Sequence, residues 1–459
     1  MKQRRDFFRK LAAWGGGAWA GRDVLRAQPP PVPVEVPGVP KLPFEVVDGA
    51  KEFHLVAEPV RVELVKGRVM DLWGYNGSMP GPTIEVHQGD RVRIVFENRL
   101  PEMTTVHWHG LEVPIEMDGV PGISQDPVPP GGRFTYEFTL HQHGSFFYHS
   151  HMAMQQMFGM IGWFIIHPKQ NYLPAVDRDY GYILQEFALL PNNTVPNTLS
   201  MEFNWLTMNG RSGPHIIPAV CRVGERVRFR FVNLGMDHHP MHLHGYQWTM
   251  TGTEGGRVPE TAWIRGNTTL VGVAQVRTVE VEATNPGDWM LHCHLPHHGM
   301  NQMVSMVGPM SHGGAGMISG GSMEHGMGIV GGAALADHNG PALGRGLGMA
   351  ADAERPTSTM VARPEQAANP ATDHSAHHPP EHAHHGATVA PAPDAGLTPG
   401  FPQDMWMPMD EDYADEPRNH GLRQGWTAAT MGMMTYLRVL DDAGFDHIAQ
   451  LERERREKA

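Results

Sequence analysis

Several features common in proteins are scarce or missing in this 459-residue chain, and each absence narrows its class. Beyond the N-terminal region, no segment approaches the roughly 18 consecutive apolar residues that a membrane-spanning helix needs. The formal net charge is −13, so nucleic acid and anionic membrane surfaces are not expected as partners. Between about residues 44 and 309 there is no long segment with the 3.6-residue period of a helix. We therefore expect a soluble protein whose structured part consists mainly of β-strands.

Cysteine is also scarce, but other metal-binding residues are abundant: there are 2 cysteines against 30 methionines and 29 histidines. Cys293 lies between His292 and His294, with His298 at Cys+5 and Met303 at Cys+10. A thiolate, an imidazole and a weak thioether are the ligands of a blue-copper electron-transfer site. On a strand, successive side chains point to opposite faces, so the cysteine and its neighbouring histidines face opposite ways. This stretch predicts two metal sites, one residue apart along the backbone.

The N-terminus carries an export pattern. Residues 3–10 include the pair Arg4-Arg5 before a Gly/Ala-rich run, and Ala18-Trp19-Ala20 is a plausible cleavage site. We expect residues 1–20 to be a twin-arginine signal peptide, and the mature protein to be periplasmic or secreted. The alternative is a basic amphipathic N-terminus retained in the cytoplasm. Residues 21–43 are Pro-rich and are expected to form an extended leader.

Two stretches, 44–168 and 180–309, consist of short strand-like runs separated by Gly and Pro. The same landmarks recur in both at the same offsets. Gly89 and His107 answer to Gly224 and His242, each pair 18 residues apart, and Gly144 and His149 answer to Gly287 and His292, each pair 5 residues apart. These matches predict an internal repeat, and hence an all-β fold of two Greek-key β-sandwich domains.

The composition changes after residue 309. Residues 310–400 are rich in Gly, Ala, Pro, Met and His, which cannot bury a core, and are expected to be largely disordered. Soft thioethers select Cu(I), which favours a role for this segment in copper handling; the alternative is a low-complexity linker with incidental metal affinity. Residues 401–459 regain aromatic and apolar content, and a helix is expected over Thr427–Leu451, before the charged run Glu452–Lys458.

Four His-x-His elements carry the rest of the expected chemistry: His107/His109, His149/His151, His242/His244 and His292/His294. On strands each pair lies on one face, and each repeat contributes two pairs. Two domains placed face to face would gather eight imidazoles, enough to hold more than one copper ion. A single pair would be explained equally well by ordinary core or surface histidines, but four pairs placed by a repeat are not.

The repeat also indicates what the first domain lacks. At equivalent offsets Cys293 corresponds to Ser150, His298 to Gln155, His239 to Thr104 and Met303 to Met160. The first domain keeps only the methionine, which is expected to be a core residue. The chain should therefore hold one blue-copper site, in the second domain.

With these motifs, residues 44–309 resemble the multicopper oxidases, specifically the two-domain, laccase-like kind with the type 1 copper in domain 2. The resemblance implies cupredoxin folds and about four copper ions per chain. It implies that the type 1 copper is bound by His239, Cys293 and His298 with Met303 as axial ligand, the type 2 copper by His107 and His242, and the binuclear type 3 pair by His109, His149, His151, His244, His292 and His294.

Two positions bear on the delivery of protons to oxygen. The resemblance implies that Asp118, near the type 2 copper, delivers protons to oxygen; the alternative is a turn residue before Gly119. Many family members carry a second acid directly after the type 1 histidine, where this chain has Gly299. Either another carboxylate or water would supply protons in its place.

The implied activity is the oxidation of a reducing substrate, one electron at a time, coupled through Cys293 to the four-electron reduction of O2 to water. The donor would be a phenol or aromatic amine, or a metal ion such as Cu(I), Mn(II) or Fe(II), and the exposed edge of His298 or His239 would accept its electrons. In two-domain members, domain 1 of one subunit meets domain 2 of its neighbour, so a homotrimer is expected.

Two alternatives remain for the function. A copper nitrite reductase is also a trimer of two-cupredoxin chains, but its blue site lies in domain 1. A non-enzymatic periplasmic copper-binding protein is favoured only by residues 310–400.

Overall fold

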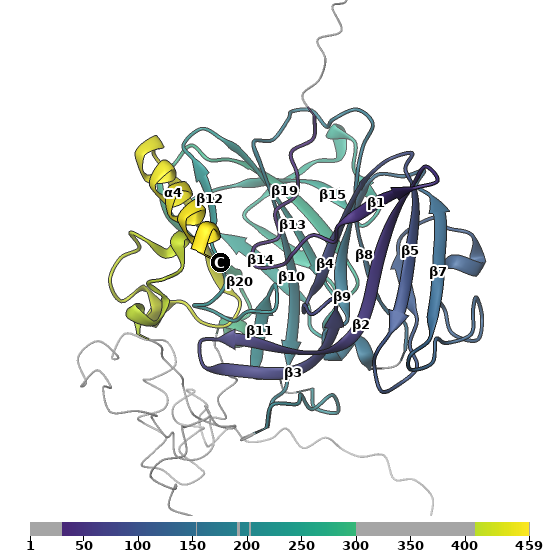
Figure 1. Ribbon diagram of the computed structural model, residues 1–459. Helices are drawn as coiled ribbons and strands as arrows, with labels where there is room; N and C mark the ends of the chain where they lie inside the picture. Colours follow the sequence, from purple (N-terminus) through teal and green to yellow (C-terminus); the bar gives the residue numbers. More distant parts are fainter. Residues whose placement is uncertain (1–29, 153, 191–192, 202, 300–408, 459) are drawn as a thin grey trace, which may run out of the picture.

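In this computed structural model, the described residues are 30–152, 154–190, 193–201, 203–299 and 409–458. They form two β-sandwich domains, and a C-terminal segment lies against the second (Figure 1). Each sandwich has its own buried apolar core. The architecture confirms the predicted all-β class of two cupredoxin-like domains. No helix among the described residues is long and apolar enough to cross a membrane.

Domain 1 consists of two sheets. Its elements are β1 (Phe44–Val47), β2 (Ala50–Val65), β3 (Arg68–Tyr75), β4 (Gly81–His87), β5 (Arg91–Asn98), β6 (Val106–His109), η1 (Ile115–Met117), β7 (Arg133–Thr139), β8 (Gly144–Ser150), η2 (Gln155–Phe158) and β9 (Ile161–His167). One sheet has the order β1-β2-β5-β7, with β3 on β2, and the other has the order β4-β9-β8-β6. In β5, Val92, Ile94 and Phe96 are fully buried, as the period of two requires for a strand with one face on the core.

Domain 2 repeats this plan. Its elements are β10 (Arg178–Phe187), β11 (Trp205–Met208), β12 (Ala219–Arg222), β13 (Arg226–Asn233), β14 (His239–Leu243), β15 (Trp248–Thr253), β16 (Gly256–Arg257), η3 (Glu260–Ala262), β17 (Ile264–Gly266), β18 (Thr268–Val271), β19 (Val276–Glu282), β20 (Gly287–Cys293), η4 (Pro296–Gly299) and β21 (Met434–Leu440). The sheets have the orders β11-β10-β13-β19-β15-β16, with β17 on β15, and β12-β21-β20-β14-β18.

One strand of domain 2 comes from the far end of the chain. β21 lies between β12, to which it is parallel, and β20, to which it is antiparallel. In domain 1, β9 has the same place between β4 and β8. The boundary predicted at residue 309 therefore differs from the structure, because domain 2 is completed by residues that follow the Met/His-rich segment. Along the chain, residues 310–400 are an insertion between β20 and β21 instead of a tail, and they lie outside the described residues.

The C-terminal segment also differs in part from its prediction. It contains η6 (Asp410–Tyr413), η7 (Pro417–Asn419), η8 (Trp426–Ala429) and, after β21, the helix α4 (Asp442–Lys458). The helix predicted over Thr427–Leu451 is wrong in its first half, because pairing with two neighbouring strands overrides local propensity there. Arg222 pairs with Asp442 and Asp446, each at 2.6 Å, and so fastens α4 to β12.

Apolar side chains from both domains share a third core. Phe147, Trp163 and Val232 are fully buried in it, together with Val34, which precedes β1. Residue Glu35 also forms a backbone bridge with Tyr180. The part of the Pro-rich leader that is described, residues 30–43, is thus extended but docked, and it helps to join the domains.

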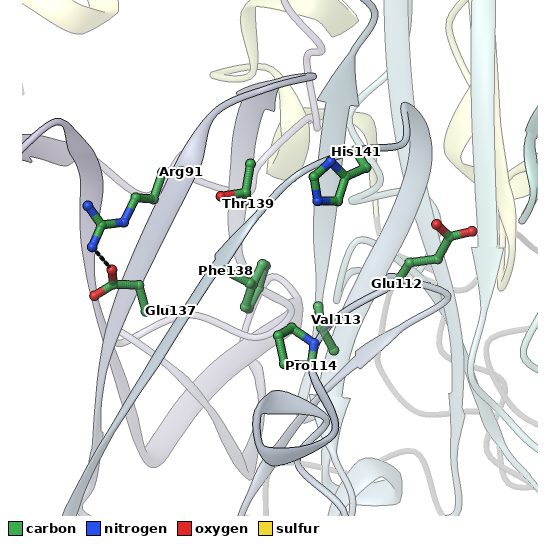
Figure 2. A pocket seen from close by; sticks show the side chains of 8 residues that line it. All are labelled: Arg91, Glu112, Val113, Pro114, Glu137, Phe138, Thr139 and His141. Atoms are coloured by element: carbon green, nitrogen blue, oxygen red, sulfur yellow. Dashed lines mark hydrogen bonds and ion pairs between the residues drawn. The ribbon is translucent and has the colours of Figure 1, made fainter.

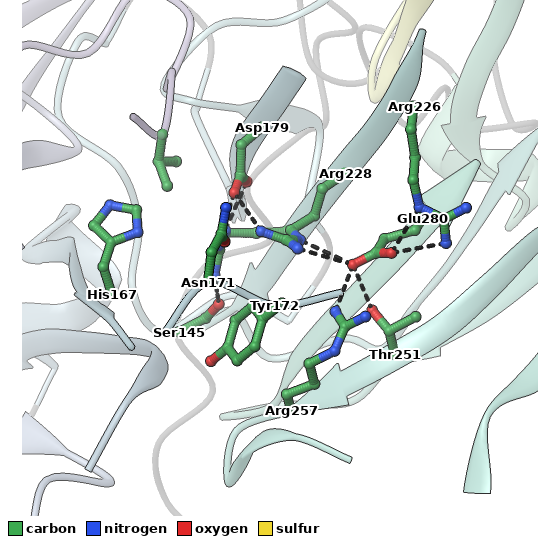
Figure 3. A network of polar contacts seen from close by, with 12 residues as sticks. Ser145, His167, Asn171, Tyr172, Asp179, Arg226, Arg228, Thr251, Arg257 and Glu280 are labelled. Atoms are coloured by element: carbon green, nitrogen blue, oxygen red, sulfur yellow. Dashed lines mark hydrogen bonds and ion pairs between the residues drawn. The ribbon is translucent and has the colours of Figure 1, made fainter. Parts of the chain in front are cut away.

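A buried network of charges lies beside this core (Figure 3). Asp179 accepts hydrogen bonds from Arg228 at 2.9 Å and Arg230 at 2.7 Å. Arg230 also donates to Ser145 of domain 1 at 2.5 Å, and Glu280 accepts from Arg228 at 3.0 Å. Because one network contacts both domains, it fixes how the sandwiches sit relative to each other.

Replacing Asp179 with Asn should destabilise the protein by about 3–5 kcal/mol, because the buried Arg230 would lose its carboxylate partner and the buried Arg228 would keep only Glu280. Asp179 is 2% exposed. The matched control is Glu282→Gln at the rim of the same network, where the carboxylate is 68% exposed and its loss should cost less than about 1 kcal/mol. Chemical denaturation of both variants checks this, and equal losses would contradict it.

Candidate metal centres

Strand β20 separates two sets of side chains that could bind a metal ion. Cys293 is 1% exposed and belongs to the core of domain 2, whereas His292 is partly exposed and His294 is exposed on the other face. This is the arrangement that the period of two predicts for a strand. In the antiparallel pair with β14, His242 stands directly opposite His292.

The buried set consists of Cys293, His239 and His298. The Cys293 Sγ lies 3.3 Å from the His298 Nδ1 and 3.8 Å from the His239 Nδ1, and these two nitrogens are 3.1 Å apart. The donor atoms of all three lie within 4.8 Å of one another. One thiolate and two imidazoles converging in an apolar core fit a copper ion of the blue type better than a hard cation, which prefers oxygen ligands.

Two carboxylates orient the imidazoles of this set. The His239 Nε2 donates to Glu186 at 3.2 Å, and the His298 Nε2 donates to Asp237 at 3.3 Å. Both Nδ1 atoms are therefore left to face the thiol, as in metal sites whose ligands are held by outer hydrogen bonds. Sequence reasoning missed Glu186, although a glutamate inside the apolar run of β10 was a signal: it is 1% exposed and needs a buried partner.

Burial shifts the pKa values of the same groups in opposite directions. Burial raises the pKa of the Cys293 thiol to about 12, with Glu186 and Asp237 adding to the effect. Burial also lowers the pKa of His298 to about 4, assisted by the neighbouring His239. At neutral pH the site thus holds a protonated thiol and a neutral imidazole, and only a bound cation would compensate the charge of a thiolate there.

Each domain also carries a quartet of histidines at the end of one sheet; His149 is buried and the other seven are partly or fully exposed. In domain 1 the His109 Nδ1 lies 3.3 Å from the His149 Nε2, and in domain 2 the His244 Nε2 lies 3.1 Å from the His292 Nε2. The domain 1 quartet is His107, His109, His149 and His151, and the domain 2 quartet is His242, His244, His292 and His294. Among the described residues, the ring contacts join histidines of the same quartet and none joins the two quartets.

Main-chain carbonyls hold the quartet rings in matching orientations. His107 donates from Nδ1 to the Asp118 carbonyl at 2.7 Å, His242 to the Asn267 carbonyl at 2.7 Å, His149 to the Ser150 carbonyl at 2.8 Å, and His292 to the Cys293 carbonyl at 2.8 Å. Because Nδ1 carries the proton in these four rings, Nε2 is free to bind a metal.

The predicted acid Asp118 lies beside the domain 1 quartet. Its Oδ1 is 3.4 Å from the His107 Nδ1, and its side chain is 29% exposed, so it has access to solvent. The next residue is confined to glycine: Gly119 has φ +81°, and a Cβ there would lie 1.9 Å from the Val106 carbonyl oxygen. The chain thus turns back tightly against β6, which holds Asp118 at the histidines.

Gly299, where the second family acid is missing, lies under β21. It is buried, and a Cβ built there would lie 2.5 Å from the Met434 Cε. Methionine is flexible, but an acid would also need a partner for its charge in this buried place. The close approach of β21 gives a physical reason for glycine at this position.

The place in domain 1 that corresponds to the Cys293 set holds no metal ligands. Ser150 and Thr104 both donate to the Gln155 Oε1 at 2.7 Å, and all three side chains are buried. These hydrogen bonds satisfy the polar groups among themselves. The observation disfavours a copper nitrite reductase, which needs its blue site in domain 1.

The predicted methionines and the predicted entry point for electrons differ in how the structure places them. Met303 lies outside the described residues, and Met160 is fully buried in the core of domain 1. The exposed edge expected at His298 or His239 is not found, since both rings are 0% exposed. Asp237, which contacts His298, is the partly exposed group at this site, with a side chain 38% exposed.

The described pockets do not include the proposed ligands. One in domain 1 has a volume of about 490 Å³ and lies between β7 and the turn before η1, with Arg91 paired to Glu137 at its side (Figure 2). Another of about 520 Å³ lies in domain 2 and includes Gly245 and Tyr246. The proposed ligands therefore form a buried cluster and two histidine quartets instead of lining one of these pockets.

The copper-free protein should lose stability as the pH falls from about 6.5 to 4. Burial lowers the pKa of His149 to about 3 and the pKa of His292 to about 4, below the value near 6.5 of an unfolded chain. In that window the unfolded state binds protons that the native state does not, so stability is present above the window and lost below it. Thermal melts of the apo-protein across this range check the prediction, and His149→Gln should flatten the slope.

Comparisons with known proteins identify the family of this chain. Two family models described as multicopper oxidase match residues 57–171 and 190–309, together just over half of the chain. A copper resistance protein A homolog from Pseudomonas syringae pv. tomato is 31% identical over 220 residues, 46% of this chain and 34% of that protein. Laccase-1 from Cryptococcus neoformans var. neoformans serotype D is 39% identical over 220 residues, 39% of this chain and 34% of that protein.

A solved structure supports the same family. The crystal structure of blue copper oxidase from Nitrosomonas europaea aligns with a TM-score of 0.50 and 31% identity, covering 55% of this chain and 81% of that one. The chain spans about a third of the length of these two curated relatives. Both sandwich domains, with the histidine and cysteine residues just described, fall within the matched ranges, and the chain belongs to the multicopper oxidase family, in its two-domain, laccase-like form.

Proposed function

We propose that this protein is a copper-dependent oxidase that couples the one-electron oxidation of a reducing substrate to the four-electron reduction of O2 to water. The observation that carries the proposal is the arrangement along β20, where the buried Cys293 adjoins His292 and His294 of an exposed quartet. A one-residue covalent link between the two kinds of donor set suits electron transfer between them. A protein that only sequesters copper would have no use for that link.

The residues fit copper as the family's cofactor. His239, Cys293 and His298 would hold the type 1 ion, His107 and His242 the type 2 ion, and the other six quartet histidines the type 3 pair. Copper supplies reversible one-electron chemistry and the binding of O2. The chain's own contribution is to orient the imidazoles through carbonyls and carboxylates, to exclude water from Cys293, and to hold the Asp118 carboxylate beside His107 for proton transfer.

The reducing substrate would meet the protein near Asp237, the partly exposed group in contact with His298. A carboxylate there would favour donors that are cationic or that release a proton on oxidation, which include phenols, aromatic amines and metal ions. These donors fall into two classes, aromatic compounds and metal ions. The names of the relatives, laccase and copper resistance protein A, suggest the same two classes. We propose both classes as substrates to be compared directly.

Copper content and oxygen uptake test the function. The copper-loaded protein should contain about four copper ions per chain and consume O2 with a phenolic donor, Cu(I) or Mn(II). A value near two would favour the nitrite reductase, and a large, variable content without oxygen uptake would favour a copper-binding protein. An internal deletion of residues 310–400 separates the oxidase domains from the Met/His-rich insertion in each assay.

We further propose a homotrimer in which the domain 1 quartet of one subunit meets the domain 2 quartet of its neighbour. Support comes from the exposure of His151, His244 and His294 and from the lack of contacts between the quartets in the described residues. Mixing two inactive variants tests this, one with His107 and His109 replaced by Ala and one with His242 and His244 replaced. Subunit exchange should restore activity at interfaces with two intact quartets; a cluster within one chain would stay inactive.

The proposed site of action is the periplasm or the cell exterior, because of the Arg4-Arg5 motif, which lies outside the described residues. Replacing both arginines with Lys should retain the protein in the cytoplasm. Cell fractionation with an antibody to the folded domains would show this, and unchanged export would exclude the twin-arginine route.

A further inference from the structure

The register of β21 places a methionine directly opposite Cys293. In the β20–β21 pair His292 stands opposite Met434, so the next step of the antiparallel register pairs Cys293 with Met433. The Cys293 N–H donates to the Met433 carbonyl at 3.0 Å, which agrees with this pairing. Residues directly opposite each other on an antiparallel pair project to the same face. The Met433 side chain therefore lies on the face of Cys293, away from the histidine quartet.

Domain 1 shows the same relation. There His149 stands opposite Ile161, and the Ser150 N–H donates to the Met160 carbonyl at 3.2 Å. Met160 is thus to Ser150 what Met433 is to Cys293. The sequence repeat instead assigned Met303, at Cys+10, as the counterpart of Met160, because it assumed a short connection after the cysteine.

Met433 also contacts a second residue of the cysteine set. Its N–H donates to the His298 carbonyl at 3.0 Å, so its backbone joins the segments that carry Cys293 and His298. The side chain is 0% exposed and lies in the same apolar core as Cys293. A thioether held there without any solvent is placed as a weak ligand would be.

We propose that Met433, and not Met303, supplies the axial thioether of the type 1 copper site. The proposal rests on the function proposed above and adds to it that the site is assembled from two chain segments separated by the Met/His-rich insertion. A type 1 ion would bind β21 to β20 through side chains as well as through the backbone.

Met241 is the main competitor within the described residues. It stands opposite Cys293 on the other side of β20, in β14, and is also 0% exposed. Its counterpart at the equivalent register of domain 1 is Val106, which stands opposite Ser150. Only Met433 has a methionine counterpart and a backbone bond to His298.

The visible spectrum and the midpoint potential of the copper-loaded, full-length protein test the proposal. A weak axial thioether stabilises Cu(II), so Met433→Leu should shift the potential in the positive direction while the protein stays blue. Met433→Gln, which offers an axial oxygen, should shift the potential in the negative direction. A change in packing alone would not give shifts of opposite sign for the two variants.

Met303→Leu and Met241→Leu are the matched controls and should leave both the spectrum and the potential unchanged. A shift with Met303→Leu or Met241→Leu, combined with wild-type properties for both Met433 variants, would overturn the proposal. A wild-type protein that binds copper but shows no blue absorption would instead refute the proposed function. If Met433→Leu fails to fold, the Met433→Gln and control spectra still decide between the three methionines.

Discussion

Truncation after residue 309 is expected to give a protein that does not fold, although both family matches and every histidine and cysteine proposed as a copper ligand would be retained. The cut removes β21, and so exposes the edges of β12 and β20, which pair with it. It also removes Met433, Leu437 and Val439 from the core, each at most 1% exposed. At about 1.5–3 kcal/mol for each buried apolar side chain, this loss is comparable to the whole stability of about 5–15 kcal/mol of a typical domain.

The matched control for the truncation is an internal deletion of residues 310–400, bridged by a flexible Gly/Ser linker that keeps residues 409–458. This variant should be soluble and retain the β-type circular dichroism and a cooperative melt, whereas the truncated chain should aggregate through its open strands. If the truncated chain were folded and bound copper as the full chain does, the assignment of β21 to domain 2 would be wrong.

The placement of the proposed copper ligands on the strands was the part of the structure that sequence could predict best. Strand alternation alone separates Cys293 from His292 and His294, and the structure has them on opposite faces. The prediction worked because the period of two is a local property of the backbone. The equivalence of Ser150 and Cys293 needed only short offsets within each copy of the repeat, and the two residues occupy matching registers in β8 and β20.

The origin of the last strand could not be predicted in this way. Residues 434–440 are a short apolar run whose strand character depends on the partners on both sides, and those partners are remote in sequence. The contact between Glu186 and His239 was not predicted for a related reason, because it joins β10 to β14 across the sandwich. Local sequence patterns indicate on which face of a strand a side chain lies and which positions of the two repeats correspond. The pairing of segments that are distant in sequence depends instead on tertiary packing.

The Cys293→Ser variant should lose the blue absorption, and its oxidase turnover should fall by more than about 100-fold. Removing even a residue that only hydrogen-bonds to a metal ligand lowers metal affinity or activity by about 10–100-fold. A serine hydroxyl stays protonated at neutral pH and is a poor ligand for a soft metal. Domain 1 indicates the outcome, because Ser150 there forms hydrogen bonds with Thr104 and Gln155. Copper analysis should still find the ions of the quartets, whose histidines lie on the other face of β20.

Cys221→Ser is the control for this experiment. Cys221 is the second free cysteine, fully buried in β12, and burial raises the pKa of its thiol to about 12, as it does for Cys293. It has no histidine of the proposed sites beside it in the sheet, where its neighbour is Val439. The Cys221 variant should therefore stay blue and active with a small loss of stability. A Cys293→Ser protein that stayed blue would show that the thiolate lies elsewhere, and the link through β20 would lose its basis.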